Sequence, residues 1–138
     1  MIIKNEKPPN WEKINKAFVL REGTIFTYGN IIFNPDGGSI DYPLMAHEIV
    51  HSVQQEKIGI ETWWNRYLAD KDFRASQEVM AYQRQYQEAR KSIKDRNRLF
   101  MFLRRLAKEL SSETYGNIMT EIEAIHAIRE ERPIEFKV

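Results

Sequence analysis

The sequence contains no cysteine in 138 residues. Disulfide bonds and cysteine-ligated zinc are therefore excluded, and any metal must be bound by histidine and carboxylate side chains. Long apolar runs are missing too, because the longest nearly uncharged one, residues 99–103, is far too short to cross a bilayer. Residues 1–9 show no signal-peptide pattern. We therefore expect a cytoplasmic protein without a membrane partner.

Neither sign of charge dominates, since 21 Lys and Arg residues stand against 20 Asp and Glu residues. The distribution is uneven, with nine basic and two acidic residues in 84–108, and seven Glu against three basic residues in 109–138. A basic stretch can bind nucleic acid, but no nucleic-acid-binding motif accompanies this one. Two oppositely charged helix faces that attract each other explain the pattern, so we expect no nucleic-acid partner.

The first forty residues have a sequence pattern typical of a small β-sheet. Residues 16–21, 24–28 and 31–33 predict strands, and the last two flank Gly29-Asn30, a two-residue hairpin signal. Residues 11–17 predict a short helix before them. Without an internal repeat or a flexible linker, residues 1–138 are expected to form a single domain.

The chain beyond Pro43 has a sequence pattern typical of helices. We expect a first helix from Pro43 to Gly59, capped by Asp41 or Tyr42. Further helices are expected at 62–68, 74–94, 96–110 and 113–130, the last capped by Ser112, with a short strand or tail at 134–138. Strands followed by helices predict an α+β fold, in which a small N-terminal antiparallel or mixed sheet precedes a helical bundle.

The first long helix carries the motif His47-Glu48-Ile49-Val50-His51. Residues four apart lie on one face of a helix, so both imidazoles can bind one zinc ion. Glu48 points about 100° away from His47, which keeps it from the metal but lets it reach a zinc-bound water as catalytic base. The apolar flanks, Ile49 and Val53 among them, predict a helix buried in the core.

A catalytic zinc usually has a third protein ligand, and no further histidine follows His51 at a suitable spacing. The candidates are Glu61, Asp70, Asp72, Glu78, Glu88 and His126. We favour Glu78, because Ala75 and Ala81 would let its helix approach the motif helix closely, and a glutamate on an apolar face needs a partner. The alternative is a surface carboxylate paired with Arg74.

The motif, followed by Glu78-Val79-Met80-Ala81, resembles the gluzincin branch of zinc metallopeptidases, and the small size resembles the minigluzincins. The resemblance covers residues 24–86. It implies a zincin-like fold, a Zn²⁺ cofactor and hydrolysis of a peptide or protein substrate. It further implies that the strand Ile31, Ile32, Phe33 and Asn34 is an exposed edge that pairs with extended substrate. One departure is Tyr82, which stands where thermolysin-like enzymes carry an acidic residue.

Several side chains around the motif are candidates for supporting roles. Gln55, or its neighbour Gln54, is placed to hydrogen-bond near the metal, and Tyr82 to orient a histidine or to stabilise the transition state, with Tyr28 and His126 as alternatives for the latter. The Trp63-Trp64 pair is expected in the core. The competing interpretation of the whole chain is a non-enzymatic or latent zincin-scaffold protein, whose bound zinc serves an interaction or assembly module.

Overall fold

The N-terminal part forms a three-stranded mixed sheet. The computed structural model describes residues 1–130, in which β1 (Ile2–Lys4) pairs parallel with β3 (Ile31–Phe33), and β3 pairs antiparallel with β2 (Phe26–Tyr28). The predicted hairpin at Gly29-Asn30 is confirmed, and Gly29 adopts the positive φ of 65° that such a tight turn requires.

The sheet order, β1-β3-β2, corrects the prediction about the edge strand. Residues Ile31 to Phe33 form the central strand, with both sides paired, so they and the adjoining Asn34 do not offer a free edge. The physical reason is that residues 2–4, to which no strand was assigned, add to the far side of β3. Among residues 1–130, the two edge strands of the sheet are β1 and β2.

The run 16–21, predicted as a strand, is not one. Helix α1 (Trp11–Ala17), which the sequence predicted, extends into it, and the chain then continues as an irregular segment up to β2. Phe18 and Leu20 of that segment pack against the aromatic cluster around Trp63 and Phe26. Phe18 and Leu20 are therefore apolar because they pack from a loop, where they are partly buried, whereas Val19 is exposed.

The remaining chain is helical, as predicted, and acidic side chains cap three of the helices. They are α2 (Tyr42–Ile58), α3 (Ile60–Ala69), α4 (Lys71–Arg90), α5 (Arg96–Leu110), the 3-10 turn η1 (Glu113–Tyr115) and α6 (Glu121–Arg129). Asp41 accepts a hydrogen bond from the backbone N–H of Leu44, while Asp70 and Asp95 cap α4 and α5 in the same way. None of these helices is long and apolar enough to cross a bilayer.

The predicted helix at 113–130 is wrong in its first half. Only η1 forms there. Gly116 and Asn117 have positive φ of 85° and 55°, so a right-handed helix cannot continue through them. Helix α6 begins later, where Thr120 and Glu123 form a reciprocal capping box. The expectation for residues 134–138 lies outside the described part of the chain.

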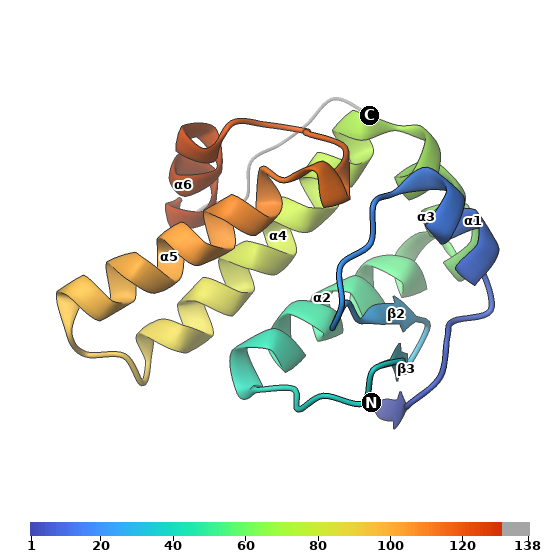
Figure 1. Cartoon of the computed structure of the whole chain (residues 1–138), viewed down its shortest axis with the longest axis horizontal. Helices are drawn as coiled ribbons and strands as arrows, with labels where there is room; N and C mark the ends of the chain where they lie inside the picture. Colours follow the sequence, from blue (N-terminus) through green and yellow to red (C-terminus); the bar gives the residue numbers. More distant parts are fainter. Residues whose placement is uncertain (131–138) are drawn as a thin grey trace.

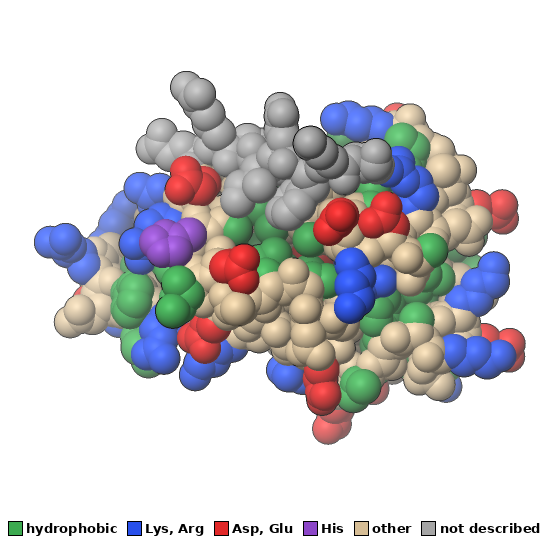
Figure 2. Space-filling view, turned by 90° about the horizontal axis from the view of Figure 1, so that it is seen from above, with side chains coloured by type: hydrophobic (Ala, Val, Ile, Leu, Met, Phe, Trp, Pro, Cys, Tyr) green, Lys and Arg blue, Asp and Glu red, His purple; other side chains and the backbone are tan. Residues whose placement is uncertain are grey.

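Helix α4 runs through the middle of the molecule, with α2 and the sheet on one side and α5 and α6 on the other (Figure 1). One core cluster joins α4, α5 and α6, and the other joins α1, the sheet, α3 and the start of α4. Arg104 of α5 forms an ion pair with Glu121 of α6 at 3.8 Å. On the face shown in Figure 2, basic and acidic side chains lie among one another.

Candidate metal centre

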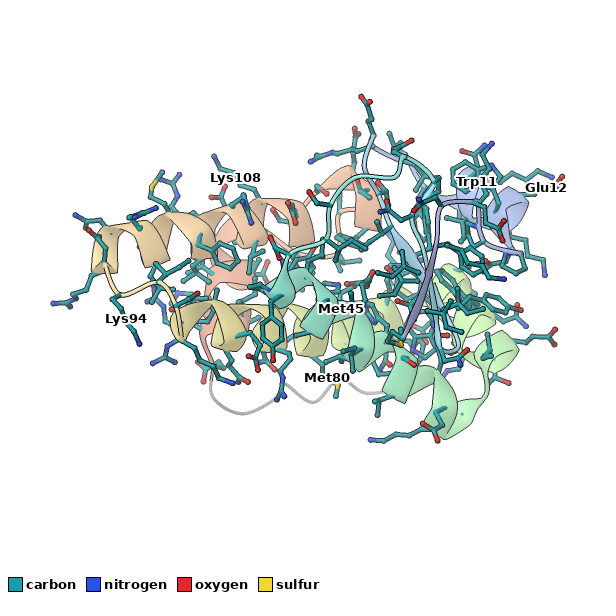
Figure 3. All side chains as sticks on the ribbon, turned by 90° about the horizontal axis from the view of Figure 1, so that it is seen from below. Trp11, Glu12, Met45, Met80, Lys94 and Lys108 are labelled. Atoms are coloured by element: carbon teal, nitrogen blue, oxygen red, sulfur yellow. The ribbon has the colours of Figure 1, made fainter. Side chains whose placement is uncertain are left out.

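Helix α2 buries its polar side chains and exposes apolar ones. The residues that it buries are His47, Glu48, His51, Gln54 and Gln55. Ile49 and Val53, expected in the core, are 43% and 46% exposed, and seen from below Met45 lies near Met80 of α4 on this outer face (Figure 3). Because buried polar groups are costly without partners, the inward face of α2 must be satisfied by specific contacts.

The two histidines of α2 meet one carboxylate oxygen of α4. Nε2 of His47 lies 3.3 Å from Oε1 of Glu78, and Nε2 of His51 lies 3.2 Å from the same oxygen. Ligand atoms bound tetrahedrally at 2.0–2.1 Å from zinc are about 3.3 Å apart. The buried group His47, His51 and Glu78 can therefore hold a metal ion. Both separations between an imidazole nitrogen and Oε1 of Glu78 fit adjacent corners of such a tetrahedron.

A hydrogen bond between Nδ1 and a glutamine oxygen orients each imidazole. Nδ1 of His47 lies 2.9 Å from Oε1 of Gln85, and Nδ1 of His51 lies 2.9 Å from Oε1 of Gln54. The Gln54 amide donates through Nε2 to the backbone carbonyl of Gln77, so its oxygen faces His51. An amide oxygen only accepts, which places the proton on Nδ1 and leaves the Nε2 lone pair to a metal.

The carboxylate of Glu78 is held from its other side by Tyr67. The Tyr67 hydroxyl donates to Oε2 of Glu78 at 2.5 Å, so only Oε1 faces the histidines. The ring of Tyr67 stacks on Trp63, which in turn contacts the ring of His51. Arg74, the alternative partner of Glu78, donates instead to backbone carbonyl groups.

Glu48 lies beside the triad without belonging to it. Its side chain is 4% exposed, and Oε2 lies 4.0 Å from Nε2 of His47 with no hydrogen-bond partner. Burial raises the pKa of this carboxyl above its ordinary value, against the opposing effect of His47 and His51. An unpartnered carboxylate oxygen next to a metal position is suited to accept a proton from water.

The charges of the metal-free triad stabilise one another. Burial lowers the pKa of His51, but the Glu78 carboxylate outweighs it and raises that pKa to about 9. Burial alone would raise the pKa of Glu78, yet the two histidines hold it well below the ordinary range. Without a metal, His51 is therefore expected to carry a positive charge at neutral pH, which it must lose when a cation binds.

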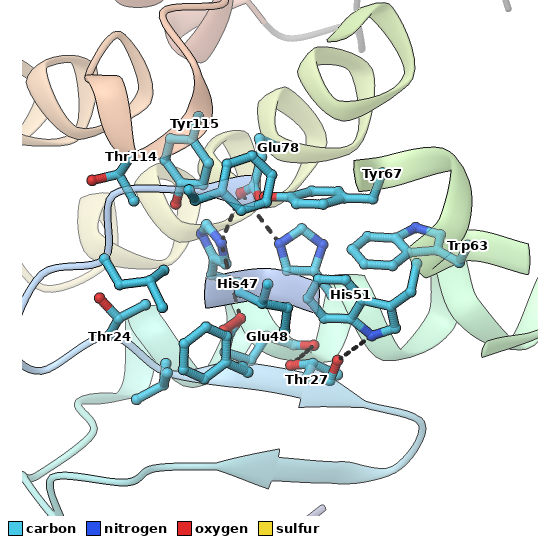
Figure 4. A pocket seen from close by; sticks show the side chains of 16 residues that line it. Thr24, Thr27, His47, Glu48, His51, Trp63, Tyr67, Glu78, Thr114 and Tyr115 are labelled. Atoms are coloured by element: carbon cyan, nitrogen blue, oxygen red, sulfur yellow. Dashed lines mark hydrogen bonds and ion pairs between the residues drawn. The ribbon is translucent and has the colours of Figure 1, made fainter. Parts of the chain in front are cut away.

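Two cavities meet beside His47 and Glu48. The smaller, of about 80 Å³, has mainly apolar and aromatic walls, and a polar one of about 230 Å³ adjoins it. The residues that line both are Thr24, Ile25, His47, Glu48, Thr114 and Tyr115. Figure 4 shows the triad between the aromatic side chains of α3 and the segment that precedes β2. A substrate that spanned both cavities would pass directly beside Glu48.

Some predicted site residues lie elsewhere. Gln55 does not reach the metal position, because it binds the backbone of Gly29 at 2.6 Å and of Thr27 at 2.9 Å and so joins α2 to the hairpin. Tyr82 packs its ring edge on His47, but its hydroxyl bonds to that of Tyr115 at 2.8 Å. Tyr82 therefore supports His47 by ring packing, without a hydrogen bond to it.

The rejected ligand candidates are also accounted for. Glu61, Asp72 and His126 are exposed, Asp70 caps α4, and Glu88 binds Lys91 and Arg84. The Trp63-Trp64 pair is buried, as expected.

Sequence reasoning missed Gln85, Tyr67, Thr114 and Tyr115. For Gln85 a signal existed, since it lies seven residues after Glu78 and so on the same helix face.

Comparison of the chain with models of protein families, with curated proteins and with solved structures finds no match.

Proposed function

We propose that this chain is a zinc-dependent metallopeptidase with a zincin-like fold, in which His47, His51 and Glu78 hold Zn²⁺ and Glu48 is the catalytic base. The observation that carries the proposal is the convergence of both Nε2 atoms on Oε1 of Glu78, next to the unpartnered Oε2 of Glu48. Zinc, when bound, would acidify a water molecule and polarise the substrate carbonyl group.

The side chains around the metal position have separate roles in catalysis. Glu48 accepts the proton of the attacking water and passes it to the leaving amine, for which its free oxygen is placed. Gln85 and Gln54 keep the imidazoles in the tautomer that binds metal. The side chain that enters the smaller cavity is expected not to be acidic, because Glu48 and Glu78 line it and no Lys or Arg of the described residues does.

The segment just before β2 supports a peptide as the substrate, because it lines both cavities. Within β2, the carbonyl of Thr27 is already occupied, because it accepts hydrogen bonds from Gln55 and Trp64. Thr24 and Ile25, just before β2, line both cavities. Alternate residues of an edge strand present backbone groups on the same side, so the backbone of Ile25 can pair with an extended chain.

A matched pair of substitutions on α2 tests the proposal. The zinc-loaded parent should cleave members of a mixed peptide library, followed by mass spectrometry. Glu48→Gln should keep the zinc but lower the rate by about 10²–10⁴-fold, since it removes the base. Glu56→Gln makes the same change at an exposed position of the helix and should cleave like the parent. Cleavage by Glu48→Gln at the parental rate would exclude this mechanism.

One observation favours the second candidate, a latent or non-enzymatic zincin-scaffold protein. The four residues of the centre are only 3–5% exposed, so little of the site is in contact with solvent in the described conformation. A parent that binds one zinc ion but cleaves no peptide of the library would support this candidate over the enzyme.

A further inference from the structure

The C-terminal part of the described chain reaches the metal centre through η1. Thr114 and Tyr115 of this turn line both cavities together with His47 and Glu48. Figure 4 shows Thr114 at the same end of the cavity as Thr24. No metal ligand comes from this part of the chain, so its contact with the site calls for another explanation.

A buried arginine fixes the position of η1. Nη1 of Arg74 donates to the carbonyl oxygen of Tyr115 at 2.9 Å, while Nε and Nη2 donate to the carbonyl oxygens of Tyr67 and Leu68. Gly116 follows with φ of 85°, and a Cβ atom there would lie 3.1 Å from Nη1. The turn is therefore anchored to α3 and α4, and its side chains hold a defined position at the site.

Thr114 has an unsatisfied hydroxyl group. Within residues 1–130, buried side-chain atoms without a hydrogen-bond partner occur only in Asn10, Glu48 and Thr114, and the last two line the same cavities. Leaving a buried hydroxyl unpaired costs about 1–3 kcal/mol, so such a group in a cavity wall is expected to meet a ligand or water. Nearby Tyr115 differs, because its hydroxyl already bonds to Tyr82.

We propose that the Thr114 hydroxyl is a substrate-binding group, which hydrogen-bonds a main-chain amide group of the peptide as it passes from the polar to the apolar cavity. This inference rests on the proposed peptidase function. Thr114 of η1 lines this passage together with residues 24 and 25 and with Glu48. A main-chain contact of this kind positions peptides of any sequence, and it gives the C-terminal part of the chain a role in the site.

Two hydroxamates separate a peptide contact from an effect on the metal. Acetohydroxamate offers only the metal-binding group, whereas the hydroxamate of an acetylated alanine–leucine dipeptide adds main-chain amides. The variants are Thr114→Val, which removes the hydroxyl at nearly constant shape, Thr114→Ser, which retains it, and Thr62→Val, the same change at an exposed residue of α3. Binding to each zinc-loaded protein is measured by calorimetry, alongside its zinc stoichiometry.

Thr114→Val should bind the dipeptide hydroxamate about tenfold more weakly, the effect of one lost hydrogen bond, with acetohydroxamate binding and zinc content unchanged. Thr114→Ser and Thr62→Val should match the parent. Parental affinity of Thr114→Val for the dipeptide probe, or an equal loss for both probes, would overturn the assignment. A parent that binds acetohydroxamate but not the dipeptide probe would instead refute the peptidase proposal, and this inference with it.

Discussion

Tyr67 donates its hydroxyl to Oε2 of Glu78 at 2.5 Å, and this contact leaves Oε1 to face Nε2 of both His47 and His51. The tyrosine comes from α3, the glutamate from α4 and the histidines from α2. Three helices therefore converge on one carboxylate, and the side chain that directs it is neutral. The outer contacts of the histidines are neutral as well, since glutamine amides take the place that carboxylates often occupy.

Tyr67→Phe should weaken zinc binding about tenfold, because Oε2 of Glu78 would be left buried without a partner. Zinc affinity can be measured by competition with a chromophoric chelator. Tyr86→Phe makes the same change in the other core cluster and should not alter it. Equal affinities for parent and Tyr67→Phe would show that Glu78 does not need this hydrogen bond.

Gln85→Met should lower zinc affinity about 10–100-fold, since the His47 ring would lose the hydrogen bond that selects its tautomer and orientation. Gln87→Met, an exposed substitution on the same helix, provides the control. With Co²⁺ in place of zinc, the visible absorption bands should change in Gln85→Met and stay unchanged in Gln87→Met. An unchanged spectrum in Gln85→Met would remove Gln85 from the support of the metal site.

Zinc binding should strengthen as the pH rises towards about 9 and should release protons at pH 7 to 8, because His51 must lose its proton to bind the ion. Isothermal titration calorimetry in buffers of different ionisation enthalpy measures the protons released. Affinity that is independent of pH between 6.5 and 9 would contradict the protonated His51 of the metal-free protein.

The metal-free protein should show the opposite trend in stability. The pKa of His51 is higher in the folded state, about 9, than its ordinary value of 6.5. Protonated His51 therefore stabilises the fold fully below about pH 6.5, and this contribution is lost as the pH rises through 9. Urea unfolding of the zinc-free chain between pH 6 and 9.5 measures the free energy of unfolding, and a rise with pH would contradict the assignment.

Zinc should stabilise the parent by about 2.7 kcal/mol when its free concentration is a hundredfold above the dissociation constant. Glu78→Ala should lose most of this gain at the same zinc concentration, because it removes one of three ligands. Glu61→Ala removes an exposed glutamate that is not a ligand of this centre, so this variant should keep the full stabilisation by zinc. Thermal unfolding with and without zinc distinguishes the two, and an equal gain for Glu78→Ala would remove Glu78 from the centre.

Arg74→Met should lower the free energy of unfolding by about 2–4 kcal/mol, since three carbonyl groups would lose a charged donor. Arg98→Met, an exposed change on α5, should cost little. Urea denaturation measures both. A loss below about 1 kcal/mol for Arg74→Met would show that η1 is held by other contacts.

The local features of the fold could be predicted because each depends on neighbouring residues. Helix α1, the cap Asp41 and the Gly29-Asn30 hairpin follow from spacing and turn chemistry. The prediction of a strand at 16–21 was wrong because a loop whose apolar residues, such as Phe18 and Leu20, pack on the core has the same composition as a strand. The prediction of one helix over 113–130 was wrong because it followed the helical spacing of the isoleucines. The chain turns at Gly116 and Asn117, so the helix begins only after them.

The sequence by itself determined that His47 and His51 share one helix face, with Glu48 beside them, because the period of the α-helix sets those relations. Only the tertiary structure decided which carboxylate meets the histidines, that Gln54 and not Gln55 orients His51, that β3 is central, and that η1 closes the cavity wall. These are contacts between residues far apart in the chain. They depend on how helices and strands pack, which no local spacing encodes.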